Sequence, residues 1–331
     1  MNFSKYKVLF RCDSGDINEL GSGHLFRCLA IARYLNIFKK ISPNKILFVI
    51  KTGKKFNKSL NILKKYPYKV FKIKENIENY SKKEIDIIRK FKADLFIIDR
   101  LGNIQKKFID EALKNFKRKV IIDDSSINRK FFDLSLNPLI TKVKQLKNSN
   151  HGINFFISPV FFYKKKYIKN FERGVFIYIG MIKNINQIKK VLLILSKNMN
   201  LPIYLPVSYA KILKKIKVHS QIIFYQNIDF YKYMYNSKFV IVSGGMSFFD
   251  AIFLNKDMVC LPQYKHQIDN VYKYQNVKNI KILIYSKPYF ERNFAKSINY
   301  FSKKGSGYKK ATKGLYKKKM KSSLTKIANL L

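Results

Sequence analysis

The stretch Asp94-Leu95-Phe96-Ile97-Ile98-Asp99 decides the fold class. Its four central side chains are all apolar, which is typical of a strand that is buried on both faces of a sheet. Similar short strand patterns with apolar centres occur at 8–10, 46–50 and 119–123, and Lys-rich segments with helical spacing separate them. Buried strands that alternate with helices predict a parallel sheet with helices on both faces.

The same alternation starts again in the second half of the chain, after a basic stretch at 164–170 that we interpret as a hinge. The length of 331 residues also favours two domains. We therefore expect an α/β protein of two doubly wound, Rossmann-like domains that face a cleft, with ligands at the carboxyl ends of the strands. The N-terminal domain, with the catalytic loop, is expected at 1–163 and the C-terminal, nucleotide-binding domain at 164–300.

The last part of the chain, 301–331, is Lys-rich and is expected to form a C-terminal amphipathic helix. Met320, Leu324, Ile327 and Leu331 can share one stripe of that helix. Such a stripe favours packing against a domain. The alternative is a helix that lies on a membrane surface.

Several features favour a cytoplasmic protein. No run of about 18 apolar residues predicts a transmembrane segment, and no signal peptide precedes the first strand. The cysteines are too few and too scattered for a disulfide framework, and they are Cys12, Cys28 and Cys260. No cluster of Cys and His predicts a zinc site, and we expect neither a metal nor another cofactor.

The net charge of +47, from 67 basic and 20 acidic residues, is typical of a nucleic-acid-binding protein. However, 58 of the basic residues are Lys and only 9 are Arg, although recognition of phosphates and bases favours Arg. Abundant Ile, Asn, Phe and Tyr, with no Trp, indicate instead an AT-rich genome that fills solvated surfaces with Lys. We expect no specific nucleic-acid partner, and the charge would concentrate an anionic substrate.

A glycine-rich loop follows the first strand and precedes a helix. It runs from Arg11-Cys12-Asp13 to Gly21-Ser22-Gly23-His24, and its glycines would let a ligand approach the backbone closely. His24 is expected at the helix N-terminus, which favours a neutral imidazole that can act as a general base. The alternative is an ordinary turn with a surface His. A Walker A loop is excluded, because its Gly-Lys-Ser/Thr ending is missing.

Carboxylates follow two of the predicted strands, as Asp99 and as the pair Asp123-Asp124. In a parallel sheet all three would lie at the edge that faces the cleft. There they would orient sugar hydroxyls, tune His24 or bind a metal. The alternative for each is to cap the element that follows its strand.

Two polar loops in the second half also connect a strand to a helix. Ser243-Gly244-Gly245-Met246-Ser247 has free backbone N–H groups that suit a diphosphate. Asp250 lies one turn further on and would reach ribose hydroxyls. The second loop, 262–267, contains His266 and Gln267. The alternative for both loops is a plain strand–helix turn.

These residues resemble a known family, the UDP-sugar hydrolases of pseudaminic-acid biosynthesis. The similarity is most specific in the first 140 residues, where Gly21-Ser22-Gly23-His24-Leu25 and Arg27-Cys28-Leu29-Ala30 look like the family's opening. It continues at 97–99, 121–125 and 133–138, and resumes at 242–247 and 262–267. The family is related to the lipid II-forming N-acetylglucosaminyltransferase, so the resemblance implies a GT-B-like fold.

The resemblance also implies a reaction, in which water displaces UDP at the anomeric carbon of a UDP-linked diacetamido-trideoxy sugar, with inversion. By position, His24 matches the histidine thought to activate that water. The sequence departs from the family at Leu101, where a Tyr is usual, at His266, where an Asn is usual, and at Gly180-Met181, where a Gly pair is usual. The expected substrate-binding residues are Arg11, Asp13, Gly21, Gly23, Asp99, Asp124, Gly180, Gly244, Gly245, Ser247, Asp250, His266 and Gln267.

Three functions are open at this point. The leading hypothesis is hydrolysis of a UDP-amino sugar, with His24 as the base. The alternative enzyme is a GT-B glycosyltransferase in which His24 activates an acceptor hydroxyl. The third possibility, a basic nucleic-acid-binding protein, has no recognised binding motif to support it.

Overall fold

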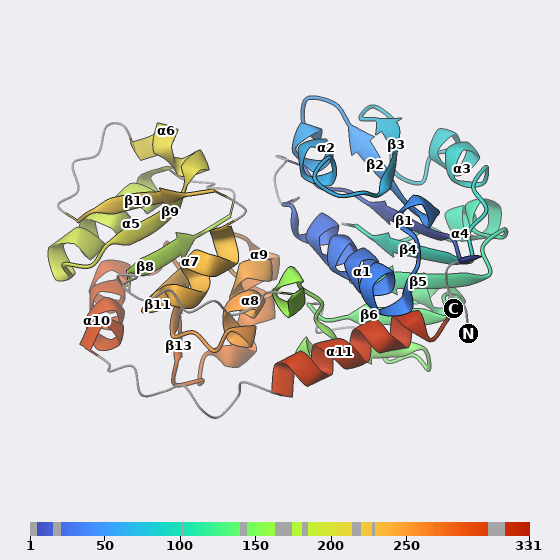
Figure 1. Ribbon diagram of the computed structural model, residues 1–331. Coiled ribbons are helices and arrows are strands. Elements are labelled where there is room, and N and C mark those ends of the chain that lie inside the picture. The colour runs from blue at the N-terminus through green and yellow to red at the C-terminus, as the bar shows by residue number, and fades with distance from the viewer. Residues whose placement is uncertain are drawn as a thin grey trace. The chain divides into compact units, whose positions relative to one another are not determined.

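The computed structural model describes residues 5–15, 21–100, 102–139, 144–162, 174–180, 185–213, 220–226, 229–303 and 315–331. The chain forms two compact units (Figure 1). Unit 1 contains Met1–Phe161 and Tyr316–Leu331, and unit 2 contains Phe162–Leu315. Each unit is built on its own parallel sheet.

The sheet of unit 1 has seven strands in the order β3-β2-β1-β4-β5-β6-β7, all paired in parallel. The strands are β1 (Val8–Cys12), β2 (Ile46–Thr52), β3 (Lys69–Lys74), β4 (Leu95–Asp99), β5 (Arg118–Ile122), β6 (Leu134–Asn137) and β7 (Ser149–His151). The helices are α1 (Gly23–Lys39), α2 (Asn57–Leu63), α3 (Lys82–Ile88), α4 (Lys106–Ala112) and α11 (Leu315–Ala328). Short 3-10 helices lie at Pro43–Lys45, Ile127–Phe131, Ile153–Phe155 and Pro159–Phe162.

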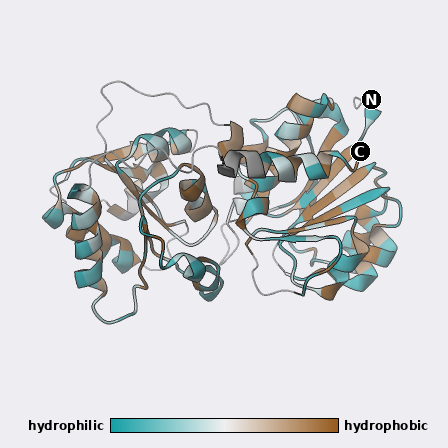
Figure 2. Cartoon of the chain, turned by 90° about the horizontal axis from the view of Figure 1, so that it is seen from below, coloured by the Kyte–Doolittle hydropathy of each residue, from teal (hydrophilic) through white to brown (hydrophobic). Residues whose placement is uncertain are grey.

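Helices cover both faces of this sheet because its central strands are apolar on both sides. On one face Leu9 and Phe96 pack with Ile85 of α3 and Phe108 of α4. On the other face α1 contacts β1 and β4 and buries apolar residues such as Leu25. Figure 2 shows the result, with mainly hydrophobic strands and more hydrophilic helices and loops around them.

The strand order places a switch point in the middle of the sheet. From β1 the chain adds β2 and β3 on one side, and β4 then pairs with the other side of β1. The carboxyl ends of β1 and β4 therefore meet where the order reverses, and this position commonly binds ligands in doubly wound sheets.

Unit 2 repeats this topology with six parallel strands in the order β10-β9-β8-β11-β12-β13. Its strands are β8 (Val175–Tyr178), β9 (Ile203–Pro206), β10 (Ile222–Tyr225), β11 (Phe239–Val242), β12 (Met258–Cys260) and β13 (Ile280–Ile282). Its helices are α5 (Ile185–Asn198), α6 (Ala210–Leu213), α7 (Phe230–Asn236), α8 (Met246–Phe253), α9 (Lys265–Val271) and α10 (Phe290–Lys303), with 3-10 helices at Val207–Tyr209 and Tyr272–Tyr274. The switch point here lies between β8 and β11.

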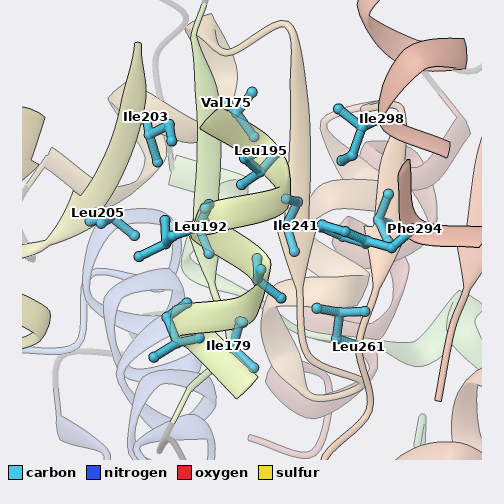
Figure 3. Close-up of a cluster of buried hydrophobic side chains, with 14 of the residues drawn as sticks. Val175, Ile179, Leu192, Leu195, Ile203, Leu205, Ile241, Leu261, Phe294 and Ile298 are labelled. Carbon is cyan, nitrogen blue, oxygen red and sulfur yellow. The ribbon is translucent and has the colours of Figure 1, made fainter. Parts of the chain in front are cut away.

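The core of unit 2 lies between its sheet and helices α5 and α10. Figure 3 shows Leu192 and Leu195 of α5 beside Ile241 of β11, with Phe294 of α10 next to them. All four side chains are completely buried, so the elements around the switch point rest on a closely packed layer.

The C-terminal helix α11 belongs to unit 1. Figure 1 shows α11 next to the end of α1. The Tyr34 hydroxyl on α1 lies 3.0 Å from the Thr325 hydroxyl on α11, and Lys326 Nζ donates to Asn150 Oδ1 at 2.7 Å. Leu324 and Ile327 are buried in this contact. The expected apolar stripe therefore packs on unit 1. A helix that lies on a membrane surface would need this stripe to be exposed.

The two doubly wound parallel sheets confirm the α/β, Rossmann-like fold expected from the sequence. In the part of the chain that the structure describes, no helix combines the length and the apolar character needed to cross a membrane.

Candidate functional site

His24 and Asp99 meet at the switch point of unit 1. Gly23 is the first residue of α1 and His24 the second, after an N-cap at Ser22 that makes no side-chain hydrogen bond. Asp99 is the last residue of β4 and is fully buried, whereas 16% of the His24 side chain is exposed. His24 Nδ1 lies 2.6 Å from Asp99 Oδ1. The structure thus joins two predicted site residues that are 75 positions apart.

Arg27 binds the Asp99 carboxylate through two hydrogen bonds. It lies one turn after His24 on α1, and its Nε and Nη2 donate to the two Asp99 oxygens at 2.8 and 2.6 Å. Its Nη1 donates to Asp123 Oδ2, just beyond β5. Burial alone would raise the pKa of Asp99, but the positive charge of Arg27, with a contribution from His24, holds that pKa below its ordinary value. Asp99 is therefore an anion at neutral pH.

An ionised Asp99 fixes the tautomer of His24. A carboxylate only accepts hydrogen bonds, so the 2.6 Å contact places the imidazole proton on Nδ1. Arg27 Nη2 is 3.3 Å from the same nitrogen, but a guanidinium has no lone pair to accept that proton. The lone pair of His24 then lies on Nε2, as a general base requires.

A second set of buried charges lies on the α3 and α4 face of the same sheet. Glu84 of α3 accepts from Arg11 Nε at 2.8 Å and from Arg100 Nη1 at 2.7 Å. Arg11 Nη1 also donates to Asp13 Oδ1 at 2.5 Å. Burial would raise the pKa of Glu84, but Arg11 and Arg100 together lower it to about 2. The predicted site residues Arg11 and Asp13 are thus tied into a buried ion cluster that holds the start of the glycine-rich loop.

Lys51, near the end of β2, borders this cluster. Its backbone N–H lies 3.4 Å from Asp13 Oδ1, and only 8% of the residue is exposed. Burial lowers the pKa of Lys51, although Asp13 opposes that change. In the sequence, the feature that could have indicated a buried Lys51 is its position at the end of an otherwise apolar strand.

Asp124 serves mainly to hold loops. One of its oxygens accepts from the Ile104 N–H at 2.6 Å, and the other accepts from the Ser126 N–H at 2.7 Å and from the Ser126 hydroxyl. Only 3% of Asp124 is exposed. The N-cap of the 3-10 helix that follows is Ser126 and not Asp124, so the structure does not bear out the capping alternative, and contact of Asp124 with a ligand stays a prediction.

In unit 2 the Gly-Gly loop leads from β11 into α8. Gly245 is the N-cap of α8 and has no side chain that could cap the helix. The Phe248 N–H donates to the Gly245 carbonyl at 3.1 Å, and the N–H groups before it have no carbonyl acceptor within the helix. A Cβ on Gly244 would lie 2.8 Å from Gln267 Cβ and 2.9 Å from the Gln267 carbonyl oxygen. At Gly245 the nearest atoms would be Gln267 Nε2 and Ser243 Oγ, both at 3.8 Å. Gly244 is thus required for packing against α9, while Gly245 leaves space.

Gln267 directs its amide nitrogen toward this space. Its Oε1 accepts from the Gln263 N–H at 2.8 Å, which leaves the Nε2 donors on the side of Gly245. Gly180, after β8, has a φ of +75° and lies against the same Ser243 hydroxyl. Ser247 is 5% exposed in the first turn of α8. These groups form a small polar cradle with N–H donors, which suits an anion.

Two further predicted residues, Asp250 and His266, lie on α8 and α9 of unit 2, and Gly21 lies in unit 1. Asp250 on α8 is 3% exposed and accepts a 3.3 Å hydrogen bond from the Tyr231 hydroxyl. The exposed ring of His266 stacks on Tyr264, with centroids 5.6 Å apart and planes 7° from parallel. Gly21 is exposed at the end of the first loop.

Part of the site lies outside the described residues, namely Leu101, Met181 and the loop residues 16–20. Sequence reasoning gave no role to Arg27, Glu84, Arg100 or Lys51. The spacing of His24 and Arg27 on one helix face was the available signal for Arg27. Within the described ranges, no three His, Cys, Asp or Glu side chains cluster as a metal ion would need.

No protein-family model matches the chain. A curated relative, "Uncharacterized protein MJ1062" of Methanocaldococcus jannaschii, is 28% identical over 275 residues, which cover 75% of this chain and 54% of the relative. The chain thus spans about half the length of that relative.

Solved structures define the fold class. The S. aureus MnaA-UDP co-structure has a TM-score of 0.64 at 12% identity and covers 98% of both chains. Spinosyn rhamnosyltransferase SpnG with thymidine diphosphate gives 0.58 at 12% identity, covering 98% of this chain and 95% of that one. UDP-GlcNAc 2-epimerase from Neisseria meningitidis, bound to UDP-GlcNAc, gives 0.51 at 13% identity, covering 97% and 100%. At such low identity the likeness establishes the fold alone, and this protein has the GT-B fold.

Proposed function

We propose that this protein is an enzyme that acts on a UDP-sugar, and that it hydrolyses a UDP-linked diacetamido-trideoxy sugar to release UDP. The observation that carries the proposal is the 2.6 Å contact between His24 Nδ1 and Asp99 Oδ1 at a switch point. The N–H cradle at Gly245 supports it, as do proteins of the same fold whose structures contain UDP or UDP-GlcNAc. Hydrolysis and the identity of the sugar rest on the sequence resemblance around Gly21–Leu25.

In the proposed reaction the water oxygen forms a bond to the anomeric carbon while His24 Nε2 takes a proton from that water. The bond from the anomeric carbon to the phosphate oxygen breaks, and its electron pair leaves with UDP. Asp99 stabilises the imidazolium that forms. The first turn of α8 and the Gln267 amide stabilise the charge on the leaving diphosphate. Displacement in one step inverts the anomeric centre.

The other predicted residues take supporting parts in this proposal. Gly21 and Gly23 let the sugar approach the backbone, and Gly180 and Ser247 complete the diphosphate cradle. Asp250 binds the ribose and His266 lies near the sugar. The buried charges at Arg11, Asp13 and Asp124 fix the loops that carry the first group.

The proposal is tested by incubating the purified protein with UDP-2,4-diacetamido-trideoxy-altropyranose, in the absence of any acceptor, and measuring UDP. We expect release of UDP and of the free sugar. His24→Ala should lower kcat by about 100-fold or more, because general-base catalysis contributes on this scale. A His24→Ala protein as active as the parent would refute the role of His24.

A glycosyltransferase is the second candidate, because proteins of this fold include the rhamnosyltransferase SpnG. In that case His24 would take the proton from an acceptor hydroxyl instead of water. UDP would then appear only when an acceptor is added, so the same assay separates the two reactions.

A further inference from the structure

Arg27 links the base of the proposed reaction to a second buried carboxylate. Its side chain is 1% exposed, and it donates to Asp99 through Nε and Nη2 and to Asp123 through Nη1. The fork fixes both oxygens of Asp99, so that Oδ1 faces His24. A buried Arg needs only one carboxylate to balance its charge, and the second one therefore changes the charge of the whole group.

Asp123 is itself held in an unusual conformation. Its φ is +52°, a left-handed backbone that non-Gly residues adopt at a cost. Its Oδ1 accepts the Leu139 N–H at 3.0 Å, while Oδ2 faces Arg27. Hydrogen bonds thus fix both oxygens of the Asp123 carboxylate. One of these bonds comes from Arg27, which also binds Asp99.

The charge around His24 follows from the groups on each neighbouring element. Among the described residues these are Arg27 and Cys28 on α1, Cys12 on β1, Asp99 on β4 and Asp123 after β5. Burial, with a hydrogen bond from Cys12, raises the pKa of Cys28, so that thiol stays neutral. Asp124 is bound by the Ile104 and Ser126 N–H groups, and Arg11 and Arg100 are engaged by Glu84 on the other face of the sheet.

The group formed by Arg27, Asp99 and Asp123 therefore carries one net negative charge while His24 is neutral. When His24 takes a proton, the net charge of these three residues together with His24 becomes zero. Without Asp123 the same proton would leave a net positive charge in a buried place, which is unfavourable.

We propose that Asp123, acting through Arg27, favours the protonated form of His24 that the reaction produces, and that Arg27 and Asp123 are positioning residues of the active site. This role rests on the proposed function of His24 as the base. The alternative is a purely structural ion cluster, which would stabilise the fold without affecting the titration of His24.

The test is a pH titration of the histidine 13Cε1 resonances by NMR, which needs no substrate. The chain has four His residues, and His24→Gln identifies the signal. In Asp123→Asn we expect the His24 resonance to titrate at lower pH than in the control variant, because a negative charge of the buried group is lost. Asn also tolerates the left-handed conformation. Asp110→Asn is the control, since Asp110 is an exposed partner of Lys106 and its loss changes the net charge equally.

Arg27→Lys is the second variant, because it retains the charge but loses the planar fork. We expect it to lower kcat by about tenfold, with KM nearly unchanged and less than half of the Asp123→Asn shift in the titration. In Asp123→Asn the acid limb of the activity profile should move to lower pH together with the resonance. A His24 midpoint that is the same in Asp123→Asn and Asp110→Asn would overturn the inference. A parent protein that releases no UDP would instead refute the proposed function. The titration would still show whether Asp123 affects the protonation of His24.

Discussion

Glu84 Oε1 lies 2.8 Å from Arg11 Nε, and this contact ties helix α3 to the central strand β1. Both side chains are completely buried. Arg100 adds two hydrogen bonds to the same carboxylate, and its guanidinium lies 3.9 Å from the centre of the Tyr80 ring. The cluster fixes the carboxyl ends of β1 and β4, and Asp99 of the proposed catalytic group is the last residue of β4.

Glu84→Gln should destabilise unit 1 by about 3 kcal/mol at pH 7, because Asp13 would then be left to balance two buried cations, Arg11 and Arg100. The pKa of Glu84 is lowered to about 2 in the folded protein from an ordinary value of 4.5. Its contribution is therefore present above about pH 4.5 and is lost as pH falls toward 2. Urea unfolding of parent and variant at pH 7 and pH 3 should show a smaller difference at pH 3.

The matched control for this experiment is Asp86→Asn on the same helix. Asp86 forms an exposed pair with Arg89, and such pairs contribute little. A difference between parent and Glu84→Gln that does not shrink at low pH would show that the cluster does not work through the charge of Glu84.

Asp99→Asn should lower kcat by about 100-fold or more and leave KM within about threefold. The neutral amide no longer fixes the Nδ1–H tautomer or stabilises the imidazolium, and loss of a carboxylate in such a pair has effects of this size. The measurement is UDP release over a range of substrate concentrations, with Asp110→Asn as the control. Equal kcat in Asp99→Asn and the parent would show that the 2.6 Å contact has no part in the reaction.

Two neighbouring glycines should respond differently to the same change. Gly244→Ala would bring a methyl group to 2.8 Å from Gln267 Cβ, so this variant should be destabilised by about 1–3 kcal/mol. Gly245→Ala meets nothing closer than 3.8 Å and should keep its Tm, but the methyl group would occupy the place of the anion.

Thermal unfolding with and without UDP distinguishes the two variants. UDP at 100 times its Kd should stabilise the parent by about 2.7 kcal/mol, and this gain should largely disappear in Gly245→Ala. If UDP stabilised Gly245→Ala as much as the parent, UDP would not bind at the cradle next to Gly245.

Much of the fold could be predicted from the sequence, because the buried strands of a parallel sheet have a distinctive apolar pattern. The same argument placed Asp99 at the carboxyl edge, where the sheet order then brings it to His24. The roles of Glu84 and Arg27 could not be predicted, since both lie on helices in a Lys-rich chain whose charged residues usually face solvent. Their burial depends on contacts between distant segments, which periodicity does not reveal.

The sequence also could not predict which surface α11 packs against. An amphipathic stripe shows that a helix has a partner but does not say which one. Leu324 is 1% exposed within unit 1, whereas Lys321 on the same helix is exposed. Leu324→Ala should therefore destabilise unit 1 by about 2–4 kcal/mol, through the lost apolar contacts and the cavity that remains.

Urea unfolding measures this change, with Lys321→Ala as the control that should stay within about 0.5 kcal/mol of the parent. If α11 instead used its apolar stripe to bind lipid, Leu324→Ala would weaken binding to anionic vesicles and leave unfolding unchanged. We expect the reverse, because Thr325 and Lys326 on either side of the stripe are bonded to Tyr34 and Asn150 of unit 1. A helix held by these contacts would have to break them before it could present Leu324 to a membrane.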